Sequence, residues 1–161
     1  MIPYFILLSI FACAALRARS FSRISRIAAF FAFSLLSLFV GFRYQTGGDW
    51  WNYLKSMKST YGVPFYRSTE VSLYEPFYAL LNWIGANGFG GLILVNFVCA
   101  LIFSFSLVRF CQSQPRPWLA LTIAIPYLVI VVAMGYTRQS VAIAFEMLAL
   151  IAIQNRQNIR F

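Results

Sequence analysis

Five blocks of apolar residues, separated by short basic or polar segments, constrain the fold of this chain more than any other feature. Apolar residue types make up 61% of the 161 residues and charged types only 11%, far from the balance of a soluble domain. Blocks of this kind predict membrane helices. We expect an all-α, polytopic transmembrane helical bundle with five membrane segments: Ile2–Leu16, Ile27–Phe42, Gly91–Val108, Trp118–Gly135 and Thr137–Ile153.

Several of these segments are shorter than the about 20 residues of an ideal span, and flanking arginines and aromatic rings can supply the missing length. The first block has the length of a signal-peptide core. Its basic residues, beginning at Arg17, follow the apolar block instead of preceding it. We therefore expect a retained first helix whose N-terminus is extracytoplasmic.

The placement of the basic residues predicts the orientation of the bundle. The net charge is +9, but the arginines gather at the ends of apolar blocks, which favours the positive-inside rule over a nucleic-acid partner. Residues 17–26, 109–116 and 156–160 would then be cytoplasmic. The 43–90 loop and the turn at Tyr136–Thr137 would lie on the opposite side of the membrane.

The residue types present exclude some chemistry. The chain has no His, so an imidazole base or metal ligand is excluded. Three cysteines without His partners indicate neither a zinc site nor a disulfide framework. We therefore expect no metal and no cofactor.

The long 43–90 loop carries two signals for short helices. The glycine pair at 47–48 breaks the preceding helix, and Asp49 is placed to cap a new one. Glu75-Pro76 marks a second start, because Pro suits the first helical position. The apolar stretch 76–84 that follows is too short to span a membrane, so it predicts an interfacial or re-entrant helix.

Two arginines lie on the side that the positive-inside rule disfavours. Arg43 follows the second membrane segment, and Arg138 opens the fifth. A guanidinium suits bidentate phosphate binding, and two of them at one membrane face could clamp a diphosphate. For Arg43, a snorkelling anchor that ends the second segment is the alternative.

The remaining candidates are one carboxyl group and two aromatic rings. Glu146 lies eight residues beyond Arg138, on nearly the same helix face, and an ionisable group at membrane depth should be buried in protein or face a water cavity. It could instead be a carboxyl that helps to pack helices. Trp50 and Tyr53 could contact a sugar, or belong to an interfacial aromatic belt.

Several of these residues form a pattern that resembles the EpsG family of bacterial exopolysaccharide-biosynthesis membrane proteins. The pattern is Arg-x-x-x-Gly-x-Asp-x-x-x-Tyr after the second membrane segment, here Arg43, Gly47, Asp49 and Tyr53. Residues 75–78 and 136–142 are similar to the next two landmarks of that family, and the first four residues match its start.

The resemblance implies a Wzy-like polymerase, a metal-independent glycosyltransferase at the outer face of the bacterial inner membrane. Such proteins join oligosaccharide repeats carried on undecaprenyl diphosphate, alongside other polysaccharide-assembly proteins. On this interpretation Arg43 and Arg138 hold the donor diphosphate. Asp49 or Glu75 is the candidate general base for the acceptor hydroxyl.

Members of that family are longer than this chain. We therefore expect residues 1–161 to be a single membrane domain that forms the N-terminal part of a longer polytopic protein. Two alternatives to a polymerase stay open from the residues alone. One is a transporter or flippase component for a lipid-linked glycan, and the other is a truncated, non-catalytic membrane protein.

Overall fold

The computed structural model describes residues 2–18, 24–67, 76–88 and 90–157, and these residues form helices and no strand. The all-α prediction is therefore confirmed. The helices are α1 (Ile2–Arg17), α2 (Arg26–Gly41), α3 (Trp50–Thr60), α5 (Pro76–Asn87), α6 (Gly91–Gln112), α7 (Pro117–Ala124), the π-helix η1 (Ile125–Ala133) and α8 (Thr137–Gln157).

Each of the five predicted apolar segments is helical, with α7 and η1 together forming the fourth. Within the described ranges, one helix is both long and apolar enough to cross a membrane. This is α6, with 22 residues and a mean hydropathy of 2.4. The shorter apolar helices are α1, α2 and the combined stretch Pro117–Ala133.

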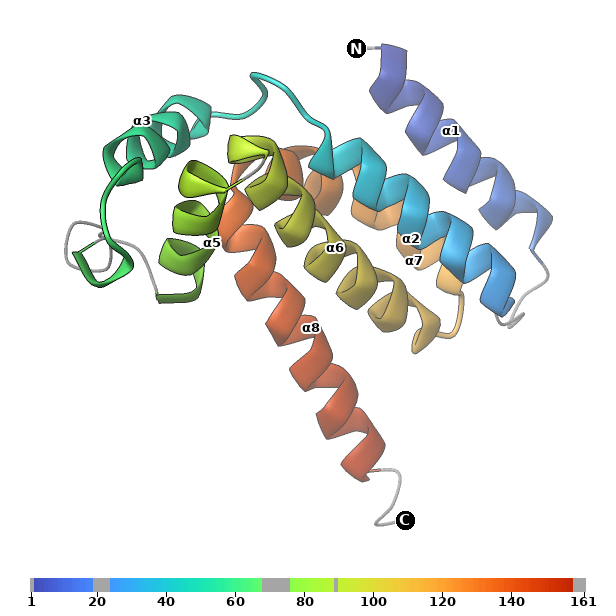
Figure 1. The fold of residues 1–161 in the computed structure, drawn as a ribbon. Helices are drawn as coiled ribbons and strands as arrows, with labels where there is room; N and C mark the ends of the chain where they lie inside the picture. The colour runs from blue at the N-terminus through green and yellow to red at the C-terminus, as the bar shows by residue number, and fades with distance from the viewer. Residues whose placement is uncertain (1, 19–23, 68–75, 89, 158–161) are drawn as a thin grey trace.

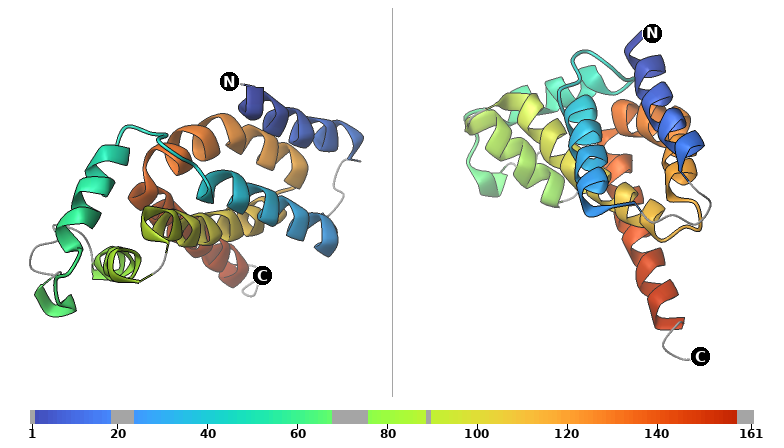
Figure 2. Two further views of the ribbon diagram at one scale, coloured as in Figure 1. Left: turned by 45° about the horizontal axis from the view of Figure 1, so that its top comes forward. Right: turned by 90° about the vertical axis from the view of Figure 1, so that its right-hand side faces the viewer.

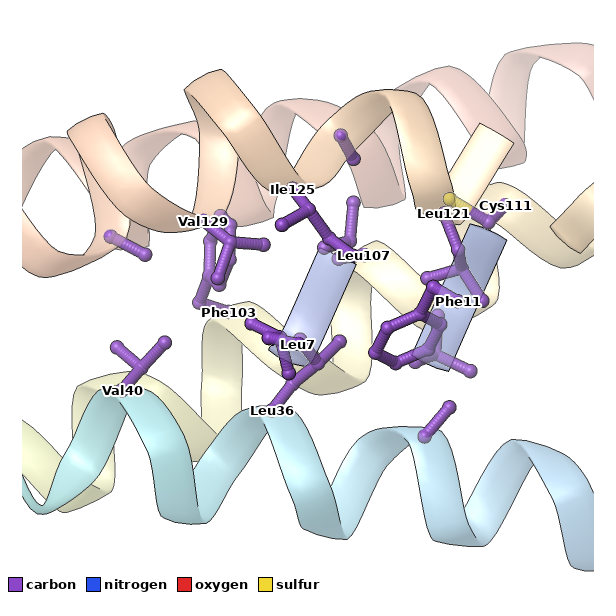
Figure 3. Close-up of a cluster of buried hydrophobic side chains, with 14 of the residues drawn as sticks. Leu7, Phe11, Leu36, Val40, Phe103, Leu107, Cys111, Leu121, Ile125 and Val129 are labelled. Atoms are coloured by element: carbon purple, nitrogen blue, oxygen red, sulfur yellow. The ribbon is translucent and has the colours of Figure 1, made fainter. Parts of the chain in front are cut away.

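The main hydrophobic core lies between α1, α2, α6, α7 and η1, whose apolar side chains meet in one cluster (Figure 3). The labelled side chains in that view are Leu7, Phe11, Leu36, Val40, Phe103, Leu107, Cys111, Leu121, Ile125 and Val129. Packing between α2 and α6 is close at Gly41, where an added Cβ would lie 2.6 Å from Cδ2 of Phe97. Helices in a bilayer gain stability from such van der Waals contact, because lipid offers no net hydrophobic driving force between them.

A second, smaller cluster holds α3 and α5 against the first half of α6 (Figure 1). Its buried members include Tyr53, Met57, Tyr78 and Val95. The segment that follows α3 is also tied to α5, because the Trp83 indole N–H donates to the Val63 carbonyl at 2.8 Å. The two predicted loop helices therefore exist, and they begin at the predicted residues, Trp50 and Pro76.

The fourth apolar segment changes from α-helix to π-helix at Ile125, directly before Pro126. Proline has no N–H and its ring disfavours regular α-helical geometry, so an interrupted helix is expected there. π-helical turns are rare and occur often at functional sites. The segment ends near Ala133, and α8 begins at Thr137 after a break at Tyr136.

Helix α8 packs its first half on α6, and its second half extends away from the other helices (Figures 1 and 2). Ala144 and Met147 are buried, whereas Glu146 is exposed. The prediction that Glu146 is a buried ionisable residue is therefore wrong for this chain. Positions 144 and 146 are about 200° apart around a helix, so a face that buries Ala144 turns Glu146 outward.

Candidate functional site

Arg43 is buried at the meeting point of α2, α6, η1 and α8, and only 5% of its surface is exposed. One terminal nitrogen (Nη1) donates to the Ala133 carbonyl at 2.8 Å. The other (Nη2) donates to Oδ1 of Asn96 at 3.2 Å and to Oγ1 of Thr137. Thr137 Oγ1 also donates to the Asn96 Oδ1, at 3.3 Å. The Arg43 side chain therefore joins three separate parts of the chain.

The local structure explains why Arg43 points inward. Helix α2 ends at Gly41, and Phe42 caps it through its backbone N–H to the Leu38 carbonyl. Arg43 is thus the first residue of the loop, and its side chain turns back over the end of the bundle. There it donates a hydrogen bond to the backbone carbonyl of Ala133, the last residue of η1 before the irregular junction with α8.

Among the described residues, the hydrogen-bond acceptors of Arg43 are all neutral. Burial lowers the pKa of the Arg43 guanidinium, and the nearby Tyr53, Tyr78 and Cys99 side chains partly oppose this effect. Arginine still keeps its proton, because its ordinary pKa is far above physiological pH. Nε of Arg43 and Nδ2 of Asn96 have no hydrogen-bond partner within the described ranges. The result is a buried positive charge with donors left over, which favours an anion nearby.

Arg138 lines a cavity of about 460 Å³ between α5, α6 and the first two turns of α8. The other residues of its wall are Phe77, Tyr78, Cys99, Val141, Ala142 and Phe145. Arg138 is the one charged side chain in that described wall, and most of the rest is apolar. This cavity can therefore take a ligand that combines an anionic group with hydrocarbon.

Tyr53 ties α3 to the start of α8 beside this cavity. Burial raises the pKa of the Tyr53 phenol, as does the nearby Asp49 carboxylate, while a hydrogen bond with the Arg138 backbone and the charges of Arg43 and Arg138 lower it. Its ring lies 5.8 Å from the ring of Tyr78, which lines the cavity. The first turn of α3 thus packs against the wall of the cavity.

The 44–49 loop is held against the η1–α8 junction by Gly47. A Cβ on Gly47 would lie 2.6 Å from the Met134 carbonyl oxygen and 2.7 Å from Cα of Gly135, and its φ is +98°. Glycine is therefore required at position 47 both for space and for backbone conformation. The prediction that the glycine pair at 47–48 breaks the preceding helix is wrong, because α2 already ends at Gly41. Gly47 instead allows the loop to approach residues 134–135 closely.

The other predicted site residues occupy less central places. Asp49 precedes α3 as expected, but its side chain accepts from Nδ2 of Asn52 at 3.3 Å instead of capping a backbone N–H. Glu75 lies outside the described residues. Trp50 and Tyr53 are 6% and 3% exposed and have packing roles. Their contact with sugar, and catalysis by Asp49 or Glu75, stay predictions.

Sequence reasoning missed Asn96 and Thr137. Asn96 interrupts the apolar run of α6, and a polar side chain inside such a run is a signal for an internal partner. Thr137 stands next to Arg138 and carried no separate signal. Only the structure brings both to Arg43.

Comparison with known families identifies the chain. The model of the EpsG family matches residues 26–161. The chain belongs to the EpsG family. No curated protein and no solved structure matches it significantly. The match covers α2 through α8, so the Arg43 network and the Arg138 cavity both fall inside the family region. Membership also agrees with a membrane-associated protein that contains the apolar helix α6.

Proposed function

We propose that this EpsG protein is a polysaccharide polymerase that joins oligosaccharide repeats linked to undecaprenyl diphosphate. It would act as a multi-pass protein of the bacterial inner membrane, with other polysaccharide-assembly proteins. The observation that carries the proposal is the cavity of Arg138, which is the one cation among the described residues of an otherwise largely apolar wall. A lipid diphosphate has the matching combination of charge and hydrocarbon. Family membership supports the same role.

In this proposal Arg138 contacts the diphosphate directly from the cavity wall. The terminal nitrogens of Arg43 already donate to neutral acceptors inside the protein, so Arg43 would not bind the diphosphate itself. Its positive charge would still attract the diphosphate. A charge buried in protein is screened less by salt than a surface charge, so it acts over a longer distance. The two predicted diphosphate ligands thereby have different tasks. Arg138 would bind the diphosphate directly, and Arg43 would attract it electrostatically without touching it.

The reaction is a glycosyl transfer. A hydroxyl oxygen of the acceptor sugar attacks the anomeric carbon of the donor, and the bond between that carbon and the diphosphate oxygen breaks. The hydroxyl proton passes to a carboxylate, for which Asp49 and Glu75 are the candidates, and the lipid diphosphate leaves with the electron pair. Arg138 would stabilise the negative charge that develops on the leaving group.

The proposed topology has five membrane segments, formed by α1, α2, α6, the α7–η1 pair and α8. The N-terminus and the 43–90 loop would be extracytoplasmic, and α3 and α5 would lie at that interface. Basic residues at 109 and 116 would then be cytoplasmic, as the positive-inside rule favours. Both arginines would thus lie at the outer face, where Arg138 would contact the lipid diphosphate.

Reconstituted protein supplied with purified lipid-linked repeats tests the proposal. We expect a ladder of longer glycans from the wild type and from Arg116→Ala, an exposed arginine remote from the site. Arg138→Ala should form no ladder, and Arg138→Lys should recover little because a lysine cannot bind a phosphate in bidentate fashion. Movement of the repeats across the bilayer without any ladder would indicate a flippase instead.

A further inference from the structure

A second cavity, of about 550 Å³, lies on the other side of the η1–α8 junction, between α1, η1 and the 44–49 loop. Tyr136 lines this cavity, whereas Arg138 lines the first one. Tyr136 lies at the break before α8 and Arg138 in the first turn of α8, so the side chains of this short segment line two different cavities. Thr137, between them, is buried in the Arg43 network.

Two glycines leave open space in the wall of this cavity. Gly135 is buried, yet an added Cβ would meet no atom within 4 Å, and at Gly48 the nearest atom would be the Tyr136 hydroxyl at 3.8 Å. Neither glycine has a positive φ. The backbone therefore does not demand glycine at either position. What glycine provides there is room, unlike Gly47, where a side chain would collide with the backbone.

The chemistry of the wall indicates the class of ligand. The described wall contains no charged side chain, so an anionic group such as a diphosphate has no partner there. The polar residues of the wall are Thr46, Tyr4 and Tyr136, and no hydrogen bond of the Tyr4 or Tyr136 hydroxyl is seen within the described residues. The remainder is apolar. A neutral ring with hydroxyl groups on its edge and an apolar face fits these features.

We propose that this cavity is a binding site for the uncharged acceptor sugar, separate from the site of the donor diphosphate at Arg138. The inference rests on the proposed function, because a polymerase must hold two glycans at once. The Tyr136–Arg138 segment would then lie between the two binding sites, with the acceptor hydroxyl reaching past its edge to the donor sugar and the buried Arg43 network fixing its position.

Thiol labelling distinguishes this inference from the proposed function. The background is the full chain with Cys13→Ser, Cys99→Ala and Cys111→Ala. To this background either Gly135→Cys, in the second cavity, or Ala142→Cys, in the Arg138 cavity, is added. The measurement is the rate of reaction with N-ethylmaleimide. The probes are free oligosaccharide released by mild acid from the host's lipid-linked repeats, farnesyl diphosphate and farnesol.

Oligosaccharide should slow the Gly135→Cys reaction about tenfold at about ten times its dissociation constant, and leave the Ala142→Cys reaction unchanged. Farnesyl diphosphate should slow the Ala142→Cys reaction and leave the Gly135→Cys reaction unchanged. An unchanged Gly135→Cys rate with oligosaccharide would overturn the acceptor site, as would protection by farnesol alone, which would mark a hydrocarbon site. Failure of farnesyl diphosphate to protect Ala142→Cys would count against the proposed function instead.

A second variant keeps the test decisive if Gly135→Cys does not fold. Gly48→Cys places its thiol in the same cavity near the Tyr136 hydroxyl, and it lies in an exposed loop with no close backbone contact. The same protection pattern is expected, and the same absence of protection would overturn the inference.

Discussion

The guanidinium of Arg43 donates a hydrogen bond at 2.8 Å to the carbonyl oxygen of Ala133, a residue 90 positions further along the chain. This bond joins the end of α2 to the end of the π-helix η1. The two cavities lie on either side of the segment that follows Ala133. The position of both sites therefore depends on a contact between a loop arginine and an irregular helix end.

Replacement of Arg43 tests this dependence. Arg43→Ala would leave the Ala133 and Thr137 oxygens without their buried donor, and we expect a loss of about 1–3 kcal/mol in the free energy of unfolding. Arg43→Lys should recover little, because one ammonium cannot reproduce the planar fork. Denaturant unfolding of the purified protein in detergent measures the change. Arg116→Ala, at an exposed position, is the control and should change stability by less than about 0.5 kcal/mol.

The neighbouring glycines 47 and 48 should respond differently to the same substitution. Gly47→Ala places a methyl group 2.6 Å from a backbone oxygen at a positive φ, so we expect a loss of about 2 kcal/mol or more. Gly48→Ala has ordinary space and should change stability by less than about 0.5 kcal/mol. Thermal unfolding midpoints of the two variants compare them directly. Equal midpoints would contradict the close approach of the loop to residues 134–135.

Asn96→Asp tests whether the buried charge itself is needed. The new carboxylate would stand where Asn96 Oδ1 now accepts from Arg43, so the fold should be kept or strengthened. The negative charge of the new carboxylate would offset the positive charge of Arg43, so the site should attract the diphosphate less strongly. Glycans formed in the reconstituted assay should then become shorter. Asn96→Ala, which removes an acceptor without adding charge, is the matched comparison. Full-length glycans from a stable Asn96→Asp variant would show that Arg43 acts only through packing.

Tyr53 should give the protein a measurable alkaline dependence. Burial raises the pKa of Tyr53 above its ordinary value of 10.0, so the folded state holds this proton more tightly than the unfolded state. Its contribution to stability is therefore complete below pH 10 and is lost as the pH rises through the raised pKa. The difference in unfolding free energy between wild type and Tyr53→Phe should shrink over that range. A difference that stays constant with pH would contradict the burial of an ionisable phenol.

Local patterns in the sequence were sufficient to predict the helices. Apolar blocks, Asp49 and Pro76 each act within a few residues, so the five apolar helical segments and the starts of the two loop helices were predicted correctly. The ends of α6 and α8, which run to Gln112 and Gln157, and the change to a π-helix at Ile125 were not. The tertiary contacts were harder. That Arg43 turns inward toward Asn96 and Thr137 depends on how three distant elements pack, and the burial of Glu146 was predicted from the cost of exposing charge to lipid, without knowledge of which face of α8 meets α6.

Site function was predictable only in part for the same reason. The sequence pattern indicated Arg138 as an anion ligand, and the structure adds the cavity that it lines. Nothing in the pattern of Gly135 or Tyr136 indicated a second cavity, because open space is a property of the packed structure alone.

Binding of a short-chain prenyl diphosphate to the purified protein tests the central claim most directly. The account predicts that farnesyl diphosphate binds the wild type, and that Arg138→Ala weakens binding at least about tenfold, or about 1.4 kcal/mol. Arg116→Ala should bind as the wild type does. Equal binding to the wild type and to Arg138→Ala would contradict the claim that the Arg138 cavity holds a lipid diphosphate.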